Sequence, residues 1–248
     1  MELAMYVWLL AGLTFVAAGL VKGVIGMGLP TIAMGLLSLV LPPAQAAAVL
    51  VVPSLVTNVW QLFAGANPIV LFRRFWSMMA GVVAGTLAGA GILVGNKAGL
   101  AVTALGMALV LYALVGLAGL KISVMRRHEF WLAPLVGATT GLVAGATGVF
   151  VLPAVLYLQA IGLAKDELVQ ALGLSFTMST IALAAGLLHM GAFPPALAGL
   201  SLLALAPALG GMWLGQGLRR RLDAAAFRRV FFAGLFVLGL YLALRGIA

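Results

Sequence analysis

One basic residue stands inside an apolar stretch, where a charge requires a physical reason. Lys22 lies four residues before the motif Gly26-x-Gly28 and has aliphatic neighbours. An ammonium group in an apolar setting is costly, so such a residue is a candidate for function, here as the counter-charge of an anion. The alternative is that its long stem carries the ammonium to the nearest aqueous interface. The sequence leaves both interpretations open.

Uncharged hydrogen-bond donors recur at about one helical turn along two other apolar stretches. They are Thr57, Asn58 and Gln61 in the first, and Ser175, Thr177, Ser179 and Thr180 in the second. Hydroxyl and amide groups can complete the shell of an anion without adding charge. Serine and threonine in membrane helices often bond to their own backbone instead. An asparagine amide is harder to satisfy in that way, so Asn58 is the strongest of these candidates.

Two glycine-rich breaks offer backbone donors. The candidates are Gly23, Gly26, Gly28, Gly145 and Gly148. Glycine lets backbone amides face a cavity, and the prolines that follow, Pro30 and Pro153, suit the first turn of a new helix. The N-terminus of such a helix presents free N–H groups and a positive dipole end to an anion. The alternative is that these glycines only allow tight helix packing. We favour the binding interpretation.

Carboxylates are few and stand near the ends of the apolar stretches or between them. They are Glu2, Glu129, Asp166, Glu167 and Asp223. A cation carrier normally has a carboxylate in the middle of a segment, so the pattern disfavours metal cations and leaves anions or neutral solutes. The sequence has no Cys, which excludes disulfides and thiolate metal sites. We expect no cofactor and no metal.

Helices in a bilayer must position these residues. The 248-residue chain is 65% hydrophobic and 8% charged, whereas soluble domains carry about 25% charged residues. Apolar runs bounded by Pro, Gly or charge give ten segments, approximately 5–27, 29–41, 44–65, 75–94, 98–119, 131–148, 150–161, 168–190, 195–217 and 228–246. Eight can cross ~30 Å of hydrocarbon. The runs 29–41 and 150–161 are too short, and we expect them to be the returning arms of broken or re-entrant helices.

The basic residues predict an orientation. Eleven of the fourteen fall in four loops, as Arg73, Arg74, Lys121, Arg126, Arg127, Lys165, Arg219, Arg220, Arg221, Arg228 and Arg229. The positive-inside rule places these loops in the cytoplasm. It also explains the net charge of +9 without a nucleic-acid partner. All four loops fall on the same side of the membrane only if the stretches 5–41 and 131–161 each return to the side they entered from. Both termini then lie outside a bacterial inner (plasma) membrane.

The sequence contains an internal repeat. Residues 19–26 read GLVKGVIG and residues 141–148 read GLVAGATG, with five of eight positions identical at an offset of 122. At the same offset Thr57-Asn58 aligns with Ser179-Thr180, and Gly89 with Gly211. We expect two transmembrane repeats, 1–122 and 123–248, in one membrane domain. Five segments with an odd number of crossings give each repeat the opposite orientation, which is typical of secondary transporters.

These motifs carry a family resemblance. The pattern Gly19-x-x-x-Gly23-x-x-Gly26-x-Gly28-x-Pro30, its counterpart Gly141-x-x-x-Gly145-x-x-Gly148 and the cluster Pro53-Ser54-x-x-Thr57-Asn58 resemble the TauE/SafE family. That family comprises sulfite and organosulfonate exporters, and is also called the toluene sulfonate uptake permeases. The resemblance covers nearly the whole chain and implies a small anion such as sulfite or a sulfonate. Phe150 stands near where the first copy has Gly28, a departure that predicts a looser backbone approach there.

The sequence therefore predicts an all-α polytopic membrane protein with two inverted-topology repeats. The expected function is secondary transport of a small anion by alternating access at a mid-membrane site between the repeats. An anion channel is the alternative, and an intramembrane enzyme is less favoured because no catalytic motif is present. The expected partners are the anionic solute, the lipid bilayer and a second copy in a homodimer. The coupling ion, H⁺ or Na⁺, is left open.

Overall fold

The computed structural model describes the backbone of residues 2–65, 67–95, 98–119, 122–219 and 221–247, and the side chains in these ranges outside 2–8, 98 and 224. The basic residues Lys97, Lys121 and Arg220 lie outside the described residues. Every regular element in these ranges is a helix, which confirms the all-α prediction. The helices are α1 (Glu2–Ile25), α2 (Leu29–Leu37), α3 (Pro43–Phe63), α4 (Pro68–Val94), α5 (Ala98–Ala118), α6 (Arg126–Thr147), α7 (Ala154–Ala160), α8 (Lys165–His189), α9 (Pro195–Leu203), α10 (Leu205–Leu218) and α11 (Ala224–Ile247).

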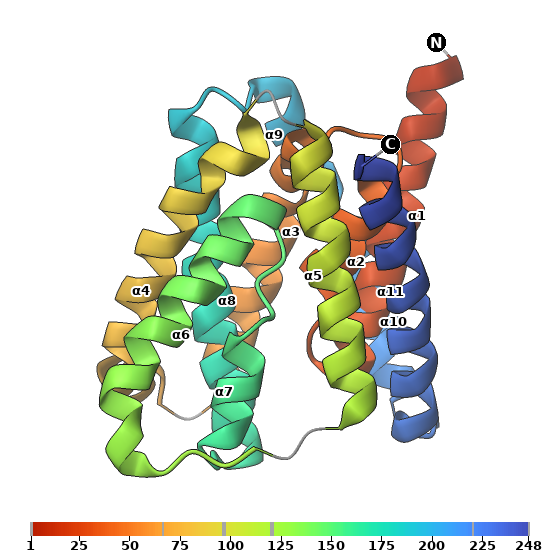
Figure 1. Cartoon of the computed structure of the whole chain (residues 1–248). Helices are drawn as coiled ribbons and strands as arrows, with labels where there is room; N and C mark the ends of the chain where they lie inside the picture. The colour runs from red at the N-terminus through yellow and green to blue at the C-terminus, as the bar shows by residue number, and fades with distance from the viewer. Residues whose placement is uncertain (1, 66, 96–97, 120–121, 220, 248) are drawn as a thin grey trace.

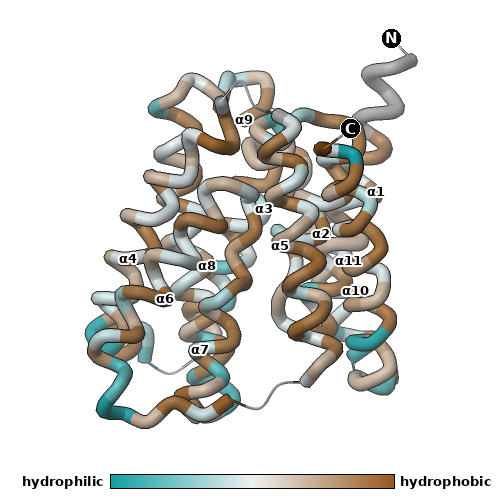
Figure 2. The backbone as a smooth tube through the Cα atoms, in the orientation of Figure 1, coloured by the Kyte–Doolittle hydropathy of each residue, from teal (hydrophilic) through white to brown (hydrophobic). Residues whose placement is uncertain are grey.

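The helices form a multi-pass membrane bundle. Seven helical stretches of the described residues are long and apolar enough to cross a bilayer, with α9 and α10 together forming one of them. The N-terminal end of α1 and the C-terminal end of α11 lie at the same end of the bundle (Figure 1). Hydrophilic residues gather at the opposite end (Figure 2). We call that opposite end the basic end, because the loops between α5 and α6 and between α10 and α11 lie there.

Several helix boundaries differ from the sequence-based prediction, and the helices include five other basic residues expected in loops: Arg126, Arg127, Lys165, Arg228 and Arg229. Arg73 and Arg74 were expected in a loop, but they lie inside α4, just before a kink at Phe75 with φ −105° and ψ 15°. The run 195–217 was expected to be one segment, but it divides into α9 and α10 at Ala204. Pro207 explains this division, since proline has no N–H to donate to the carbonyl four residues earlier and its ring crowds that turn.

A helix ends at each of the two glycine-rich motifs. Gly26 and Gly28 separate α1 from α2 with φ of 86° and 104°, and Gly148 ends α6 with φ of 71°. These are left-handed conformations, which glycine adopts without the steric cost of a Cβ. The helices that follow the breaks, α2 and α7, have nine and seven residues. At 1.5 Å per residue they cover about 14 Å and about 10 Å, so neither crosses a bilayer.

Glycine contacts bring three helix pairs into backbone-to-backbone contact. The first pair is α4 with α6, the second is α1 with α10, and the third is α5 with α11. A Cβ on most of their glycines would overlap a backbone atom of the partner helix. The glycines concerned are Gly81, Gly85, Gly89, Gly137, Gly141 and Gly145 in the first pair, Gly19, Gly23, Gly211 and Gly215 in the second, and Gly99, Gly106, Gly239 and Gly246 in the third. Such small-residue contacts are how helices associate closely in lipid.

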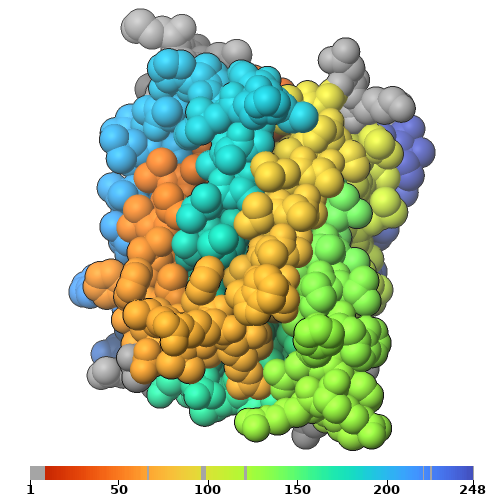
Figure 3. Space-filling model, turned by 90° about the vertical axis from the view of Figure 1, so that its left-hand side faces the viewer, coloured from red at the N-terminus to blue at the C-terminus, as the bar shows by residue number. Residues whose placement is uncertain are grey.

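The first two pairs flank a central pair, α3 and α8. Figure 3 shows α8 lying between α3 and α4 on one face of the bundle, and α8 packs against both. α5 packs against α11 on the other side of the molecule. At the basic end, Arg74 and Glu129 join α4 to α6 by an ion pair of 3.0 Å. The helices that carry most of the buried polar side chains, α3 and α8, are therefore enclosed by other helices.

Neighbouring glycines on α10 provide a matched test of this packing. A Cβ at Gly211 would overlap the Val16 carbonyl oxygen, whereas a Cβ at Gly210 meets no atom within 4 Å. We expect Gly211→Ala to lower stability by about 1–3 kcal/mol through overpacking. Gly210→Ala should be neutral or slightly stabilising, because alanine favours helix. Melting temperatures of the purified variants in detergent measure the difference, and equal values for the two variants would contradict the packing described.

Candidate functional site

The Lys22 ammonium is buried in the bundle and bonded to α3. Its Nζ donates to Thr57 Oγ1 at 3.1 Å and to Asn58 Oδ1. The residue is only 4% exposed. The stem therefore does not carry the charge to an interface, and of the two interpretations left open by the sequence, the structure favours a buried cation. Its position follows from α1, because Lys22 lies in the last turn before the break at Gly26.

A directed chain of hydrogen bonds continues from Lys22 to α8. Asn58 accepts from Lys22 through Oδ1 and donates through Nδ2 to Thr180 Oγ1 at 3.3 Å. The Thr180 hydroxyl donates in turn to the Phe176 carbonyl at 2.7 Å. Thr57 likewise donates to the Pro53 carbonyl at 2.7 Å while it accepts from Lys22. One chain of contacts thus joins α1, α3 and α8. We call Lys22, Thr57, Asn58 and Thr180 the lysine cluster.

The lysine cluster contains a cation and no anion. Among the described residues the ion pair found is the one between Arg74 and Glu129 at the basic end. Neutral oxygens alone therefore receive the Lys22 ammonium. An ammonium carries three hydrogens, and two of them have side-chain partners here. The cluster can accept an oxyanion, since both a positive charge and a donor remain to be matched.

Serine hydroxyls without partners line the same two helices. Ser54 of α3 and Ser175 and Ser179 of α8 are fully buried, and the hydroxyl of each has no hydrogen-bond partner among the described atoms. Buried polar groups are ordinarily bonded, and an unsatisfied one costs ~1–3 kcal/mol. Ser54 was not among the predicted site residues. Its signal was its spacing, four residues before Asn58 and so one turn away on the same face.

A polar cavity extends from the basic end toward the lysine cluster. Its volume is about 670 Å³, and its polar lining residues are Gln61, Lys165, Asp166, Gln216 and Arg219. Gln61 follows Asn58 by three residues on α3, so the cavity wall reaches within one turn of the cluster. The backbone N–H of Gln216 lies beside Gly23 of α1. Lys165 and Arg219 outnumber Asp166 in this lining and leave it a net charge of +1, which favours the approach of anions. We call this cavity the inlet.

The predicted glycines divide into two groups. Gly23 and Gly145 lie inside α1 and α6, where they contact the backbones of α10 and α4. That placement gives them a packing role. Gly26, Gly28 and Gly148 lie at the breaks, and the space beside Gly26 holds no atom within 4 Å of a Cβ position. The structure thus brings Lys22 together with the side chains of α3 and α8, and keeps Gly23 and Gly145 at helix contacts.

Comparison with known proteins adds the family. The profile of the family "Sulfite exporter TauE/SafE" matches residues 11–242. The chain belongs to this family. No curated protein and no solved structure matches the chain. The resemblance inferred from the motifs is confirmed, and the lysine cluster, both breaks and the inlet lie within the matched part of this TauE/SafE chain. TauE/SafE proteins are membrane transporters of sulfur anions, which agrees with the multi-pass fold.

Two substitutions test the hydrogen-bond chain as structure. Asn58→Ala removes an acceptor from the buried Lys22 and a donor to Thr180, so we expect a loss of about 1.5–3 kcal/mol, the range for bonds to charged groups. In a chain of this size each kcal/mol shifts the melting temperature by about 2–4 °C. Ser179→Ala is the control, because its hydroxyl has no partner to lose. Thermal unfolding measures both variants, and equal melting temperatures would show that the Asn58 contacts do not stabilise the protein.

Proposed function

We propose that this chain is a secondary transporter of a small sulfur oxyanion, sulfite or an organosulfonate, which binds against Lys22 between two inverted repeats. The observation that carries the proposal is the buried Lys22 ammonium, which is 4% exposed and bonded only to neutral groups. The TauE/SafE membership supplies the class of anion. Metal cations have no carboxylate to bind in the lysine cluster.

The energetics favour an anion at this position. Taking a charge out of water costs several kcal/mol, and hydroxyl and amide dipoles compensate for it only in part. An oxyanion would supply the missing counter-charge and accept from the hydroxyls of Ser54, Ser175 and Ser179. The Asn58 amide has a broad, roughly two-fold χ2 preference. It can therefore turn its Nδ2 toward the anion when the solute displaces Oδ1 from Lys22.

Helix packing supports the two repeats, 1–122 and 123–248. α1 and α6 run in opposite directions (Figure 1). The counterparts α3 and α8 pack against each other, as do α5 and α11, whereas α1 contacts α10 and α6 contacts α4. This is the arrangement that a two-fold axis in the membrane plane produces. Asn58 and Thr180 are bonded across 122 residues, the repeat offset itself, so they mark the position of the axis.

The sequence alignment pairs Gly211 with Gly89, but the helix contacts pair Gly211 with Gly85, one helical turn earlier. A Cβ at Gly211 would meet the Val16 carbonyl, and a Cβ at Gly85 would meet the Ala138 carbonyl. Val16 and Ala138 are 122 residues apart, since 138 − 16 = 122. Gly85 is therefore the counterpart of Gly211, at an offset of 211 − 85 = 126. Four residues are one helical turn, so the same face still meets its partner.

We further propose alternating access, with this conformation open at the basic end. The inlet supports this because it opens at the basic end and its inner wall is one turn from Asn58. The basic end would face the cytoplasm of a bacterial-type plasma membrane, with both termini outside. Movement of the glycine-packed pairs about α3 and α8 would then expose Lys22 to the other side. The driving gradient would be one of H⁺ or Na⁺.

Lys22→Met separates function from stability. Methionine matches the length of the lysine stem without its charge, so we expect the melting temperature to stay the same or rise. We expect gradient-driven sulfite uptake into proteoliposomes to fall to background. Arg127→Met is the control, because Arg127 is exposed and outside the cluster. Wild-type uptake rates in Lys22→Met would disprove the proposal, and uptake that never exceeds equilibration in the wild type would indicate a channel.

The absence of Cys from the sequence makes orientation directly measurable. Ser123, between α5 and α6, and His189, at the end of α8, are both exposed and lie at opposite ends of the bundle. In intact cells we expect an impermeant maleimide to label His189→Cys and to leave Ser123→Cys unlabelled until the cells are opened. The reverse pattern would invert the proposed orientation.

A further inference from the structure

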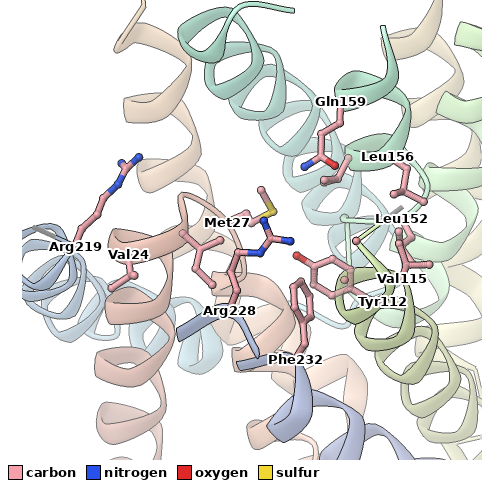
Figure 4. Close-up of a pocket in the computed structure, with 14 residues that line it drawn as sticks. Val24, Met27, Tyr112, Val115, Leu152, Leu156, Gln159, Arg219, Arg228 and Phe232 are labelled. Atoms are coloured by element: carbon pink, nitrogen blue, oxygen red, sulfur yellow. The ribbon is translucent and has the colours of Figure 1, made fainter. Parts of the chain in front are cut away.

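A second cavity lies at the basic end, separate from the lysine cluster. Its volume is about 460 Å³, and residues of α1, α5, α7 and α11 line it, together with Met27, Gly119, Leu152 and Arg219 from the segments between helices. Its polar lining residues are Tyr112, Gln159, Arg219 and Arg228, and most of the remaining wall is aliphatic or aromatic. Figure 4 shows the Arg228 guanidinium between Met27 and the Tyr112 hydroxyl. Arg219 also lines the inlet, so the two cavities are neighbours.

Tyr112 presents an unsatisfied donor to this cavity. The residue is 3% exposed, and its hydroxyl has no hydrogen-bond partner among the described atoms. Its ring is held edge-on against Phe232, with centroids 5.1 Å apart at 84°. The hydroxyl points toward Arg228 (Figure 4). The Tyr112 oxygen could accept from the guanidinium, but no hydrogen bond joins the two groups among the described atoms. The Tyr112 O–H and the exposed Arg228 guanidinium are therefore both free to donate to a third group.

An oxyanion would give the Arg228 guanidinium and the Tyr112 hydroxyl a shared acceptor. No carboxylate pairs with Arg228 among the described residues, and the planar fork of arginine matches the oxygens of sulfonate, carboxylate or phosphate groups. An oxygen between Arg228 and Tyr112 would accept from both. The apolar wall, which includes Met27, Leu156 and Phe232, cannot hydrate a bare inorganic ion. It can contact the organic body of a larger solute, as walls of ligand pockets do.

We propose that this cavity is a second anion site, specific for amphiphilic organic anions. The oxyanionic head would lie between Arg228 and Tyr112, and the apolar body against Met27, Leu156 and Phe232. Binding here requires no transport, and the site rests on the proposed function only in that an anion so held would lie beside the inlet to Lys22. The site would thereby select organic anions over inorganic ones before they reach the lysine cluster. An organosulfonate and an anionic lipid share this chemistry, so the test must separate them.

The test uses the full-length chain in phosphatidylcholine nanodiscs, in a Lys22→Met background that removes the lysine cluster as a binding site. The probes are p-toluenesulfonate and methanesulfonate, which share a head group and differ in the ring. We expect calorimetry to show p-toluenesulfonate binding at least about ten-fold tighter than methanesulfonate. Adding Arg228→Gln or Tyr112→Phe should weaken p-toluenesulfonate by about ten- to a hundred-fold, the effect of one lost bond to a charged ligand.

The controls separate failure of this site from failure of the proposed function. Arg229→Gln changes an exposed neighbouring charge that does not line the cavity and should leave affinity unchanged. Tyr112→Phe removes only a hydroxyl, so its folding is the least affected. Loss of all p-toluenesulfonate binding in Lys22→Met alone would overturn the second site while leaving Lys22 as the transport site. Equal affinities for the two probes, or insensitivity to Arg228→Gln, would also overturn it.

A lipid arm identifies the source of the ligand. With phosphatidylglycerol in the nanodisc, unchanged p-toluenesulfonate affinity would assign the site to a soluble anion. A loss of ten-fold or more, together with co-purified phosphatidylglycerol that disappears in Arg228→Gln on native mass spectrometry, would assign it to a lipid head group. Either result supports a site for an amphiphilic anion and decides which one occupies it.

Discussion

The hydrogen bonds from Lys22 to Thr57 and Asn58 hold a charge inside the bundle, and no carboxylate of the described residues pairs with it. In a low-dielectric interior such a charge is tolerated only when the surrounding polar groups form a connected set of hydrogen bonds in which each donor has an acceptor. This set runs from Lys22 through Asn58 to Thr180 and ends on a backbone carbonyl. Because each group in the chain has a partner, α1, α3 and α8 are tied together at one level of the bundle. The account of function depends on this single cation.

The glycine contacts make that arrangement possible. α1 reaches the central helices with Lys22 because it lies directly against α10, where side chains would otherwise separate the two backbones. α6 lies against α4 in the same way, and the pair flanks α8 from the other side. The break at Gly26 then ends α1 one turn beyond Lys22, and leaves the inlet and the second cavity on either side of Arg219. Close packing and the breaks therefore position the charge and its approaches.

Local sequence predicted what depends on local chemistry. The apolar runs, the breaks at Gly26 and Gly148, the family, and Lys22 and Asn58 as candidates all follow from composition, from backbone freedom and from the cost of burying polar groups. Contacts between segments far apart in the sequence could not be predicted in this way. Glycine looks the same whether it faces an anion or a helix, so Gly23 and Gly145 were assigned to binding although they lie at helix contacts. The orphan hydroxyls of Ser54 and Tyr112 and the approach of Arg228 to Tyr112 arise only in the folded bundle.

Anomalous diffraction from crystals soaked in selenite would test the central claim most directly, because selenite matches the shape and charge of sulfite and selenium marks its position. The account predicts a selenium peak between α3 and α8, about 4 Å from Lys22 Nζ, the distance spanned when one hydrogen bond and one Se–O bond meet at an angle. It also predicts that Asn58 Oδ1 no longer accepts from Lys22. A peak confined to the surface or to the breaks, with Lys22 still bonded to Asn58, would contradict the account.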